Sequence, residues 1–211
     1  MKTGTPTETR EQILNAAERL FAISGFTGTS LRAVTRAADV NLAAVHYHFG
    51  SKEELFRVIV KRIAEPIVQQ QLQGLEALER SVDIPSIEQL IEAFVAPSVS
   101  LYRQITQEES EMCLTHAQFM GRCRTEPQPI QQIAEQEFCK SHERFLEMLQ
   151  KVLPNQSPAE LEWKLDLIIA MIIRVLNQTK PLELSAAEDT TQQATQVIQR
   201  LVAFITSGIG K

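Results

Sequence analysis

Residues 29–52 contain Arg32, His46, Tyr47 and Lys52, whose side chains differ in chemistry and can each form polar contacts. Arg32 offers a guanidinium that can bind guanine in a bidentate manner or hold a phosphate. His46 and Tyr47 add an imidazole and a phenolic hydroxyl, and Lys52 follows as a second cation. Phosphates accept hydrogen bonds from such groups, while base edges in the major groove both donate and accept them. These residue types therefore indicate DNA recognition.

Two short helices joined by a tight turn must position these side chains. Ser30 can cap the first helix, and residues 39–41 form the turn because Asp and Asn hydrogen-bond their own backbone. The second helix, residues 41–48, is too short to fold alone and must be held by its neighbours. Ala43 and Ala44 give it a slim flank, which suits a helix lying in a major groove. The pattern is typical of a helix-turn-helix.

The position of each residue separates base-edge candidates from phosphate candidates. The first group lies near the start or on the outward flank of the second helix: Asn41, Leu42, Ala43 and His46. The second group supplies hydroxyls and an ammonium: Thr29, Ser30, Tyr47 and Lys52. Leu42 offers only apolar contact, so we expect DNA shape to add specificity. In the alternative interpretation Tyr47 and His48 are partly buried packing residues and Lys52 is a solvated charge.

The segment VNLAAVHYHFGSKEEL and the preceding TSLR resemble the DNA-binding domain of the TetR family of transcriptional regulators. The resemblance covers roughly residues 9–63, and its most specific part is residues 47–55, which combine an aromatic residue, a helix stop and a new capped helix. It implies an all-α fold of about nine helices, a homodimer, and a small-molecule effector. The family's groove contacts fall here on Arg32, Leu42, Ala43 and His46. The same segment is similar to a branch of the family that responds to fatty acids.

The charge distribution agrees with a DNA reader at the N-terminus. Residues 1–62 hold nine Lys/Arg and six Asp/Glu, giving +3, whereas residues 63–211 hold twelve and twenty, giving −8, so the two sum to the net charge of −5. Chance asymmetry is the alternative explanation. We expect a DNA-binding domain over residues 9–54 and an effector-binding and dimerisation domain over residues 55–211.

Cysteine usage and hydropathy favour the cytoplasm. Three widely spaced cysteines fit a reducing compartment rather than a disulfide framework. The N-terminus lacks the apolar core of a signal peptide. The most apolar run, residues 165–176, is about half the length needed to span a bilayer, so we expect no membrane association.

Capping patterns predict where the helices begin. Five Ser/Thr-x-x-Glu/Gln patterns start at Thr9, Ser51, Ser86, Ser157 and Ser185. The first eight residues are expected to be loose, and the first helix is expected to end at Gly25. Pro66 is expected to kink or break the long helix that starts at Lys52. Further helices are predicted over residues 108–124 and 129–153, and no stretch has the alternation of a strand.

The last two predicted helices are apolar enough to form a subunit interface. One stripe is predicted to pack against the same helices of a partner: Leu165, Ile168, Ile169, Ile172, Val175, Leu176, Val197, Leu201, Phe204 and Ile205. The opposite side of the first of these helices is apolar too, so a core buried within one subunit is the alternative. A homodimer is favoured because one short helix-turn-helix reads too few bases alone.

The middle of the chain carries Met and aromatic residues suited to a lipophilic ligand. The candidate effector pocket comprises Met112, His116, Phe119, Met120, Phe138, His142 and Phe145. These residues can equally be core, but the resemblance favours a pocket for a fatty acyl or other lipophilic effector. Arg103, Arg122 and Arg124 can meet the head group of such a ligand or lie on the surface.

Other classes of function have weaker support in the residues. Cys113-x-x-His116 and Cys139-x-x-His142 share a spacing that could place a zinc ion between two helices, but a Cys-x₂₋₄-Cys element is absent. No metal, cofactor or redox role is therefore expected. The chain has no phosphate-binding glycine loop, nucleophile elbow or His-Glu-x-x-His helix, so an enzyme is not expected. A helical interaction module without specific DNA binding is the remaining alternative.

Overall fold

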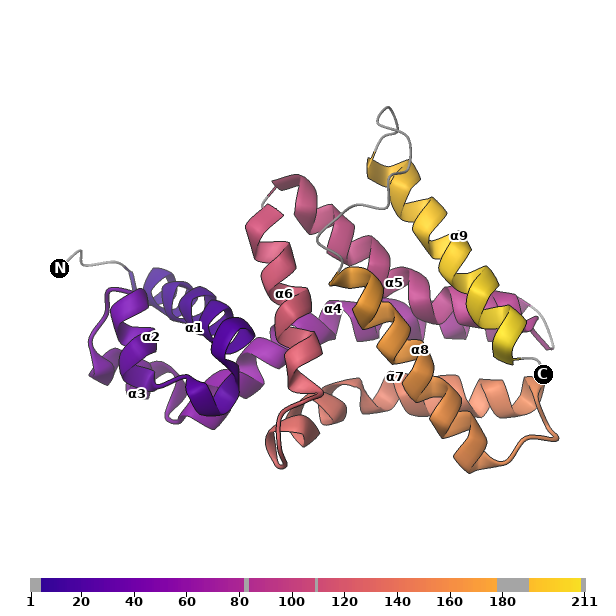
Figure 1. Ribbon diagram of the computed structural model, residues 1–211, viewed down its shortest axis with the longest axis horizontal. Coiled ribbons are helices and arrows are strands. Elements are labelled where there is room, and N and C mark those ends of the chain that lie inside the picture. Colours follow the sequence, from indigo (N-terminus) through magenta and orange to yellow (C-terminus); the bar gives the residue numbers. More distant parts are fainter. Residues whose placement is uncertain (1–4, 82–83, 109, 178–189, 210–211) are drawn as a thin grey trace. The chain divides into compact units, whose positions relative to one another are not determined.

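The computed structural model (Figure 1) describes residues 5–81, 84–108, 110–177 and 190–209, with side chains described at 5–81, 84–100, 115–177 and 194–209. Within these residues the chain forms helices α1 to α9 and no strand, which confirms the predicted all-α class. The chain divides into two compact units: residues 1–64 with 115–137, and residues 65–114 with 138–211. The two are called the N-terminal unit and the C-terminal unit.

Three helices of the N-terminal unit are grouped together in Figure 1: α1 (Pro6–Gly28), α2 (Leu31–Ala37) and α3 (Leu42–Phe49). Helix α1 begins earlier than its sequence pattern predicted. Its N-cap is Thr5, whose hydroxyl accepts from the Glu8 amide while the Glu8 carboxylate accepts from the Thr5 amide, and Pro6 occupies the first helical position. This capping box replaces the one expected at Thr9, and residues 5–8 are accordingly not loose.

Helix α1 bends at Gly25 rather than ending there. Gly25 has a φ of 72° and a ψ of 175°, a conformation open to glycine, and helical structure resumes through Gly28. The Thr29 hydroxyl closes the bend by donating to the Gly25 carbonyl at 2.8 Å. The predicted helix end was therefore wrong by one short turn.

Helices α4 (Lys52–Ser81), α6 (Ser110–Cys123) and α7 (Ile130–Val152) each contribute residues to both units. Helix α4 runs on without a break past Pro66, contrary to the alternative of a broken helix. Phe119 of α6 belongs to the N-terminal core, where its ring centroid lies 5.1 Å from that of Phe56 and 6.4 Å from that of Phe21. The N-terminal unit thus includes parts of α6 and α7 as well as the predicted helix-turn-helix.

The C-terminal unit also contains α5 (Ile87–Glu108), α8 (Pro158–Leu176) and α9 (Thr190–Ile209). Helix α5 packs along α9 and also contacts α8. In the core of this unit the ring centroids of Phe94 and Phe145, both fully buried, lie 4.3 Å apart. The predicted caps at Ser86 and Ser157 are confirmed, since each hydroxyl accepts from the amide three residues later. The predicted start at Ser185 lies outside the described residues.

No helix in the described part of the chain is both long and apolar enough to cross a membrane.

Candidate functional site

Helix α3 is short, and local caps and two buried side chains hold it. The Asn41 side chain caps it by accepting from the Ala44 amide at 2.8 Å. Val45 and Phe49 are buried beneath it. The preceding α2 is capped as predicted, with Ser30 Oγ accepting from the Ala33 amide at 3.1 Å. Anchoring α3 from one side leaves its other flank free to meet a ligand.

The free flank of α3 carries the predicted base-edge residues. Leu42, Ala43 and His46 are exposed there. Tyr47, which the alternative interpretation placed in the packing, is 83% exposed. His48 is half-buried, and its ring packs edge-on against that of Tyr47. A major groove admits an α-helix, and exposed apolar, imidazole and phenol groups can contact the base edges there.

His46 forms two hydrogen bonds with Gly50, the residue that follows the end of α3: one through its side chain and one through its backbone. Its Nδ1 lies 2.8 Å from the Gly50 carbonyl oxygen, while the Gly50 amide donates to the His46 carbonyl at 2.9 Å. Gly50 adopts a φ of 71°, so glycine is the residue that fits this position with least strain. This contact favours one orientation of the exposed imidazole on the free flank.

The Lys52 side chain is partly buried and contacts an aromatic ring, so it is not the solvated charge of the alternative interpretation. Its Nζ lies 4.1 Å from the centroid of the Phe26 ring, in a cation–π contact. Burial lowers the pKa of the Lys52 ammonium, against the attraction of Glu53 and Glu126, which raises it. The neighbouring Ser51 hydroxyl accepts from the Glu54 amide at 3.0 Å and caps α4, as predicted. The cation is thus held at the N-terminus of a helix, where an anion is favoured.

Thr29 does not fit the role of a phosphate contact. It is 3% exposed, and its hydroxyl donates to the carbonyls of Gly25 at 2.8 Å and Leu20 at 3.1 Å. Both hydrogen bonds join Thr29 to the bend of α1, so the side chain stabilises the fold and is not available to a phosphate. Ser30 and Arg32 remain exposed beside α3 and keep their predicted positions at the surface.

A buried carboxylate that sequence reasoning missed joins three helices of the N-terminal unit. Glu18 on α1 is 1% exposed and forms an ion pair with Arg62 of α4. His116 Nε2 of α6 lies 2.8 Å from the other Glu18 oxygen. Glu18 follows Leu14 by four residues and precedes Phe21 by three, so helical spacing was the available signal of its burial.

The loop between α6 and α7 holds the bend of α1. The Phe26 amide donates to Glu126 Oε1 at 2.9 Å. A methyl group built on Gly25 would lie 2.4 Å from the same oxygen, so a larger residue at this position would displace the carboxylate. Glu126 thus links α6 and α7 to the segment that leads into α2.

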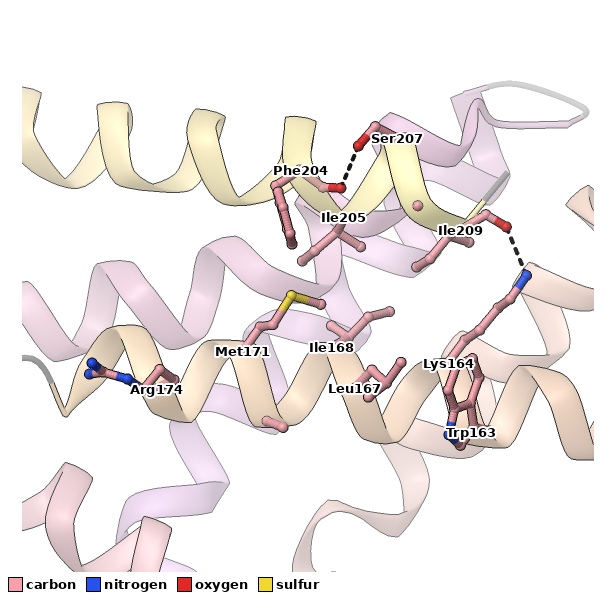
Figure 2. A pocket seen from close by; sticks show the side chains of 12 residues that line it. Trp163, Lys164, Leu167, Ile168, Met171, Arg174, Phe204, Ile205, Ser207 and Ile209 are labelled. Atoms are coloured by element: carbon pink, nitrogen blue, oxygen red, sulfur yellow. Dashed lines mark hydrogen bonds between the residues drawn. The ribbon is translucent and has the colours of Figure 1, made fainter. Parts of the chain in front are cut away.

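A second exposed surface, apolar and hollowed, lies between α8 and α9 in the C-terminal unit. Figure 2 shows Phe204 and Ile205 of α9 facing Ile168 and Met171 of α8. The groove encloses about 570 Å³. Trp163 is 60% exposed and Phe204 68%. Such large apolar side chains are seldom left in water over a contiguous area without a partner.

The structure revises which face of α8 and α9 is open. Six residues predicted to lie in a subunit interface are buried in the chain's own core: Leu165, Ile168, Ile172, Val197, Leu201 and Ile205. Ile169, Val175 and Leu176 pack partly against that core, and Phe204 alone of the predicted set is an exposed large apolar side chain. Both faces of α8 are apolar, so periodicity could not tell the inner face from the outer one.

Lys164 fixes the end of α9 beside this groove. The residue is 6% exposed, and its Nζ donates to the Ile209 carbonyl at 2.9 Å and to Gln156 Oε1 at 2.7 Å. Figure 2 shows the side chain reaching from α8 to the last turn of α9. A cation at a helix C-terminus satisfies a carbonyl that lacks an intrahelical partner.

The predicted effector residues are divided between the two units. His116, Phe119 and Met120 belong to the N-terminal unit, whereas Phe138, His142 and Phe145 belong to the C-terminal unit. The Met112 and Arg103 side chains lie outside the described residues. Phe138 stacks on His142, with ring centroids 5.7 Å apart, and Phe94 lies 5.8 Å from the same imidazole.

The cysteines differ in environment. Cys123 is buried, and burial raises the pKa of its thiol. Cys139 is exposed, and the hydrogen bond that its thiol donates to Glu143 raises the pKa of that thiol. No cluster of three His, Cys, Asp or Glu side chains suited to a metal occurs among the residues that the structure describes. The Cys113 side chain of the considered zinc site lies outside them.

Comparison with protein families gives matches to both parts of the chain. Residues 13–59 match the family of "Bacterial regulatory proteins, tetR family". Residues 92–208 match "Tetracyclin repressor-like, C-terminal domain". Together the two matches cover most of the sequence and correspond to the helix-turn-helix and to the helical body.

Individual relatives are similar over shorter stretches or at lower identity. The transcriptional repressor AcnR of Corynebacterium glutamicum is 37% identical over 59 residues, which are 28% of this chain and 31% of that protein. PfmR, a TetR family regulator from Thermus thermophilus, shares 17% identity with a TM-score of 0.60, covering 93% of this chain and 97% of its own. AibR, solved with isovaleryl coenzyme A and operator DNA, shares 17% identity with a TM-score of 0.59, covering 92% and 98%. The two structures show that the fold is shared.

Proposed function

This chain belongs to the TetR family of bacterial transcriptional regulators, and we propose that it is a homodimeric repressor that binds a palindromic DNA operator and is released by a small molecule. The observation that carries the DNA-binding part is the free flank of α3, with Tyr47 exposed beside the capped N-terminus of α4. A neighbouring cation, Lys52, adds positive charge where phosphates approach.

The groove between α8 and α9 supports the proposed dimer. A second copy that laid its own α8 and α9 against this groove would cover Trp163, Leu167 and Phe204 on both subunits, because a two-fold interface uses the same patch twice. Two copies would also present two α3 helices to successive half-sites of a palindrome, about one helical turn apart or a multiple of it. A dimer formed through this apolar patch would both cover the exposed side chains and supply the second α3 helix that a palindrome requires.

The release step rests on the helices common to both units. Helices α4, α6 and α7 contribute to the C-terminal unit and also to the N-terminal unit that carries α3, and the candidate effector residues lie on α6 and α7. His116 and Glu126 attach the α6–α7 segment to α1. An effector that shifted α6 or tilted α4 would change the separation of the two α3 helices, so that both could no longer seat in successive grooves.

The proposed effector is a fatty acyl or other lipophilic compound. The aromatic and methionine side chains of the middle helices suit such a ligand. AibR, a structural neighbour, was solved with an acyl coenzyme A and operator DNA together. Lipophilic acids and their coenzyme A thioesters are accordingly the first compounds to screen for release.

A binding titration tests the proposal most directly. Purified protein is titrated against its own upstream DNA, or against sequences obtained by random selection, at two salt concentrations. We expect tight binding that resists competitor DNA and weakens as salt rises. Binding without sequence preference, lost at modest salt, would contradict the proposal and favour the interaction module instead.

Tyr47 offers the cleanest variant for this titration. Because its side chain is largely solvent-exposed, Tyr47→Ala should leave the fold and the oligomeric state intact and weaken operator binding by about tenfold. Lys52 is less suitable because its removal also takes away the contact with Phe26. Ile23→Ala is the matched control, since Ile23 is 70% exposed in the same unit but lies on α1. Equal binding by the two variants would exclude Tyr47 from the interface.

A further inference from the structure

The His46 imidazole makes a hydrogen bond to the Gly50 carbonyl, and this acceptor determines which ring nitrogen carries the proton. The ring nitrogen Nδ1 lies 2.8 Å from the Gly50 carbonyl oxygen. A carbonyl oxygen accepts and never donates, so the proton in this bond must sit on Nδ1. A neutral imidazole carries one proton, which leaves Nε2 with a free lone pair.

The backbone at Gly50 makes this state a built feature rather than a passing one. The Gly50 φ of 71° and ψ of −64° aim its carbonyl at the imidazole, while the Gly50 amide donates to the His46 carbonyl at 2.9 Å. A methyl group on Gly50 would meet nothing within 4 Å, so the demand for glycine comes from the backbone angle and not from crowding.

The other base-edge candidates on α3 do not compete for this role. The Asn41 side-chain oxygen is already used as the cap of α3, and Leu42 and Ala43 have no polar side-chain atom. Among these candidates, His46 is therefore the exposed residue whose neutral side chain keeps a hydrogen-bond acceptor, Nε2.

We propose that His46 is a specificity-determining residue that reads one base as an acceptor through Nε2, selecting adenine or cytosine over guanine or thymine at that position of the operator strand. In the major groove adenine N6 and cytosine N4 are donors, whereas the guanine and thymine edges offer acceptors. Placing Nε2 against either acceptor would leave two lone pairs facing each other. The inference rests on the DNA-binding function proposed above.

The tautomer can be tested without DNA. Long-range proton–nitrogen NMR of the ¹⁵N-labelled protein, under mildly alkaline conditions that keep imidazoles neutral, reports which ring nitrogen carries the proton. We expect the Nδ1–H form for His46, whereas the Nε2–H form is the ordinary one for a free imidazole in water. Finding the Nε2–H form at His46 would overturn the inference even if the protein binds its operator.

The base preference is tested with single base-pair variants of the selected operator. At one position of each half-site, adenine or cytosine should bind about fivefold or more tightly than guanine or thymine. His46→Ala should abolish that preference at this position and leave the others unchanged. His48→Ala is the matched control, because it removes the same side chain from the same helix at a half-buried position.

The outcomes separate this inference from the proposed function. A preference for guanine or thymine that disappears in His46→Ala would show that Nε2 donates, which contradicts the assignment. An unchanged preference profile in His46→Ala would remove His46 from base recognition while the operator binding stands. Absence of specific binding by the unaltered protein would overturn both.

Discussion

The flank of α3 and the groove between α8 and α9 are built in opposite ways. The flank of α3 presents scattered groups of different chemistry, and two of them make local contacts: His46 with the Gly50 carbonyl, and Tyr47 with the His48 ring. The groove of α8 and α9 presents contiguous apolar side chains, with Lys164 bound to the last turn of α9 beside it. A surface for DNA must position single donors and acceptors, whereas a surface for a second copy must remove apolar area from water.

This comparison predicts that a charge harms the two surfaces to different degrees. Phe204→Asp would place a carboxylate in the apolar groove, where a partner subunit would bury it without a counter-charge. Because Phe204 is largely exposed in the single chain, the fold should survive while the dimer dissociates. Loss of the second α3 should lower operator affinity by about 10²- to 10⁴-fold. Light scattering and the DNA titration measure the two effects.

The next residue supplies the control for Phe204. Ile205 is 2% exposed, so Ile205→Asp buries a charge in the chain's own core and should unfold the C-terminal unit. Phe204→Leu keeps an apolar side chain and should keep the dimer. A folded, dimeric Phe204→Asp variant would place the subunit interface elsewhere.

A smaller effect is expected from the buried carboxylate of the N-terminal unit. Glu18→Ala leaves Arg62 and His116 without their buried partner and should lower the free energy of unfolding by about 1–3 kcal/mol. Urea unfolding followed by circular dichroism measures this change. Glu11→Ala is the control: Glu11 pairs with the same Arg62 at 3.2 Å but is exposed, so it should cost less than about 1 kcal/mol. Equal costs would mean that the burial of Glu18 contributes nothing.

The sequence predicted those features that depend on neighbours along the chain. Caps at Ser30, Ser51, Ser86 and Ser157 appear as predicted because a cap involves residues only three apart. The short turn and the exposed flank of α3 follow from the same local chemistry. The predicted helix start at Thr9 failed because a stronger local signal, Thr5 with Pro6 and Glu8, lies one turn earlier.

Features that depend on distant residues could not be predicted. The burial of Thr29 follows from bonds to α1, and the pairing of Glu18 joins positions 44 residues apart. The inner face of α8 is decided by packing against α5 and α9, which composition does not reveal when both faces are apolar. In all three cases, contacts between residues distant in the sequence decide which side chains are buried. The exposed residues of α3 depend on local caps instead, so the sequence predicted their exposure but not the burial of the α8 residues.

The smallest expected effect concerns the link between Glu126 and the bend of α1. Glu126→Ala leaves the part-buried Phe26 amide without its acceptor and should lower the free energy of unfolding by about 1 kcal/mol. Glu126→Gln keeps an oxygen at the same place and removes only the charge, so it should recover most of that loss. If the α6–α7 loop also transmits the effector signal, the alanine variant should bind operator DNA but release it less completely at saturating effector. A variant with ordinary stability and full release would show that this hydrogen bond takes no part in release, and that α4 alone connects the effector to the two α3 helices.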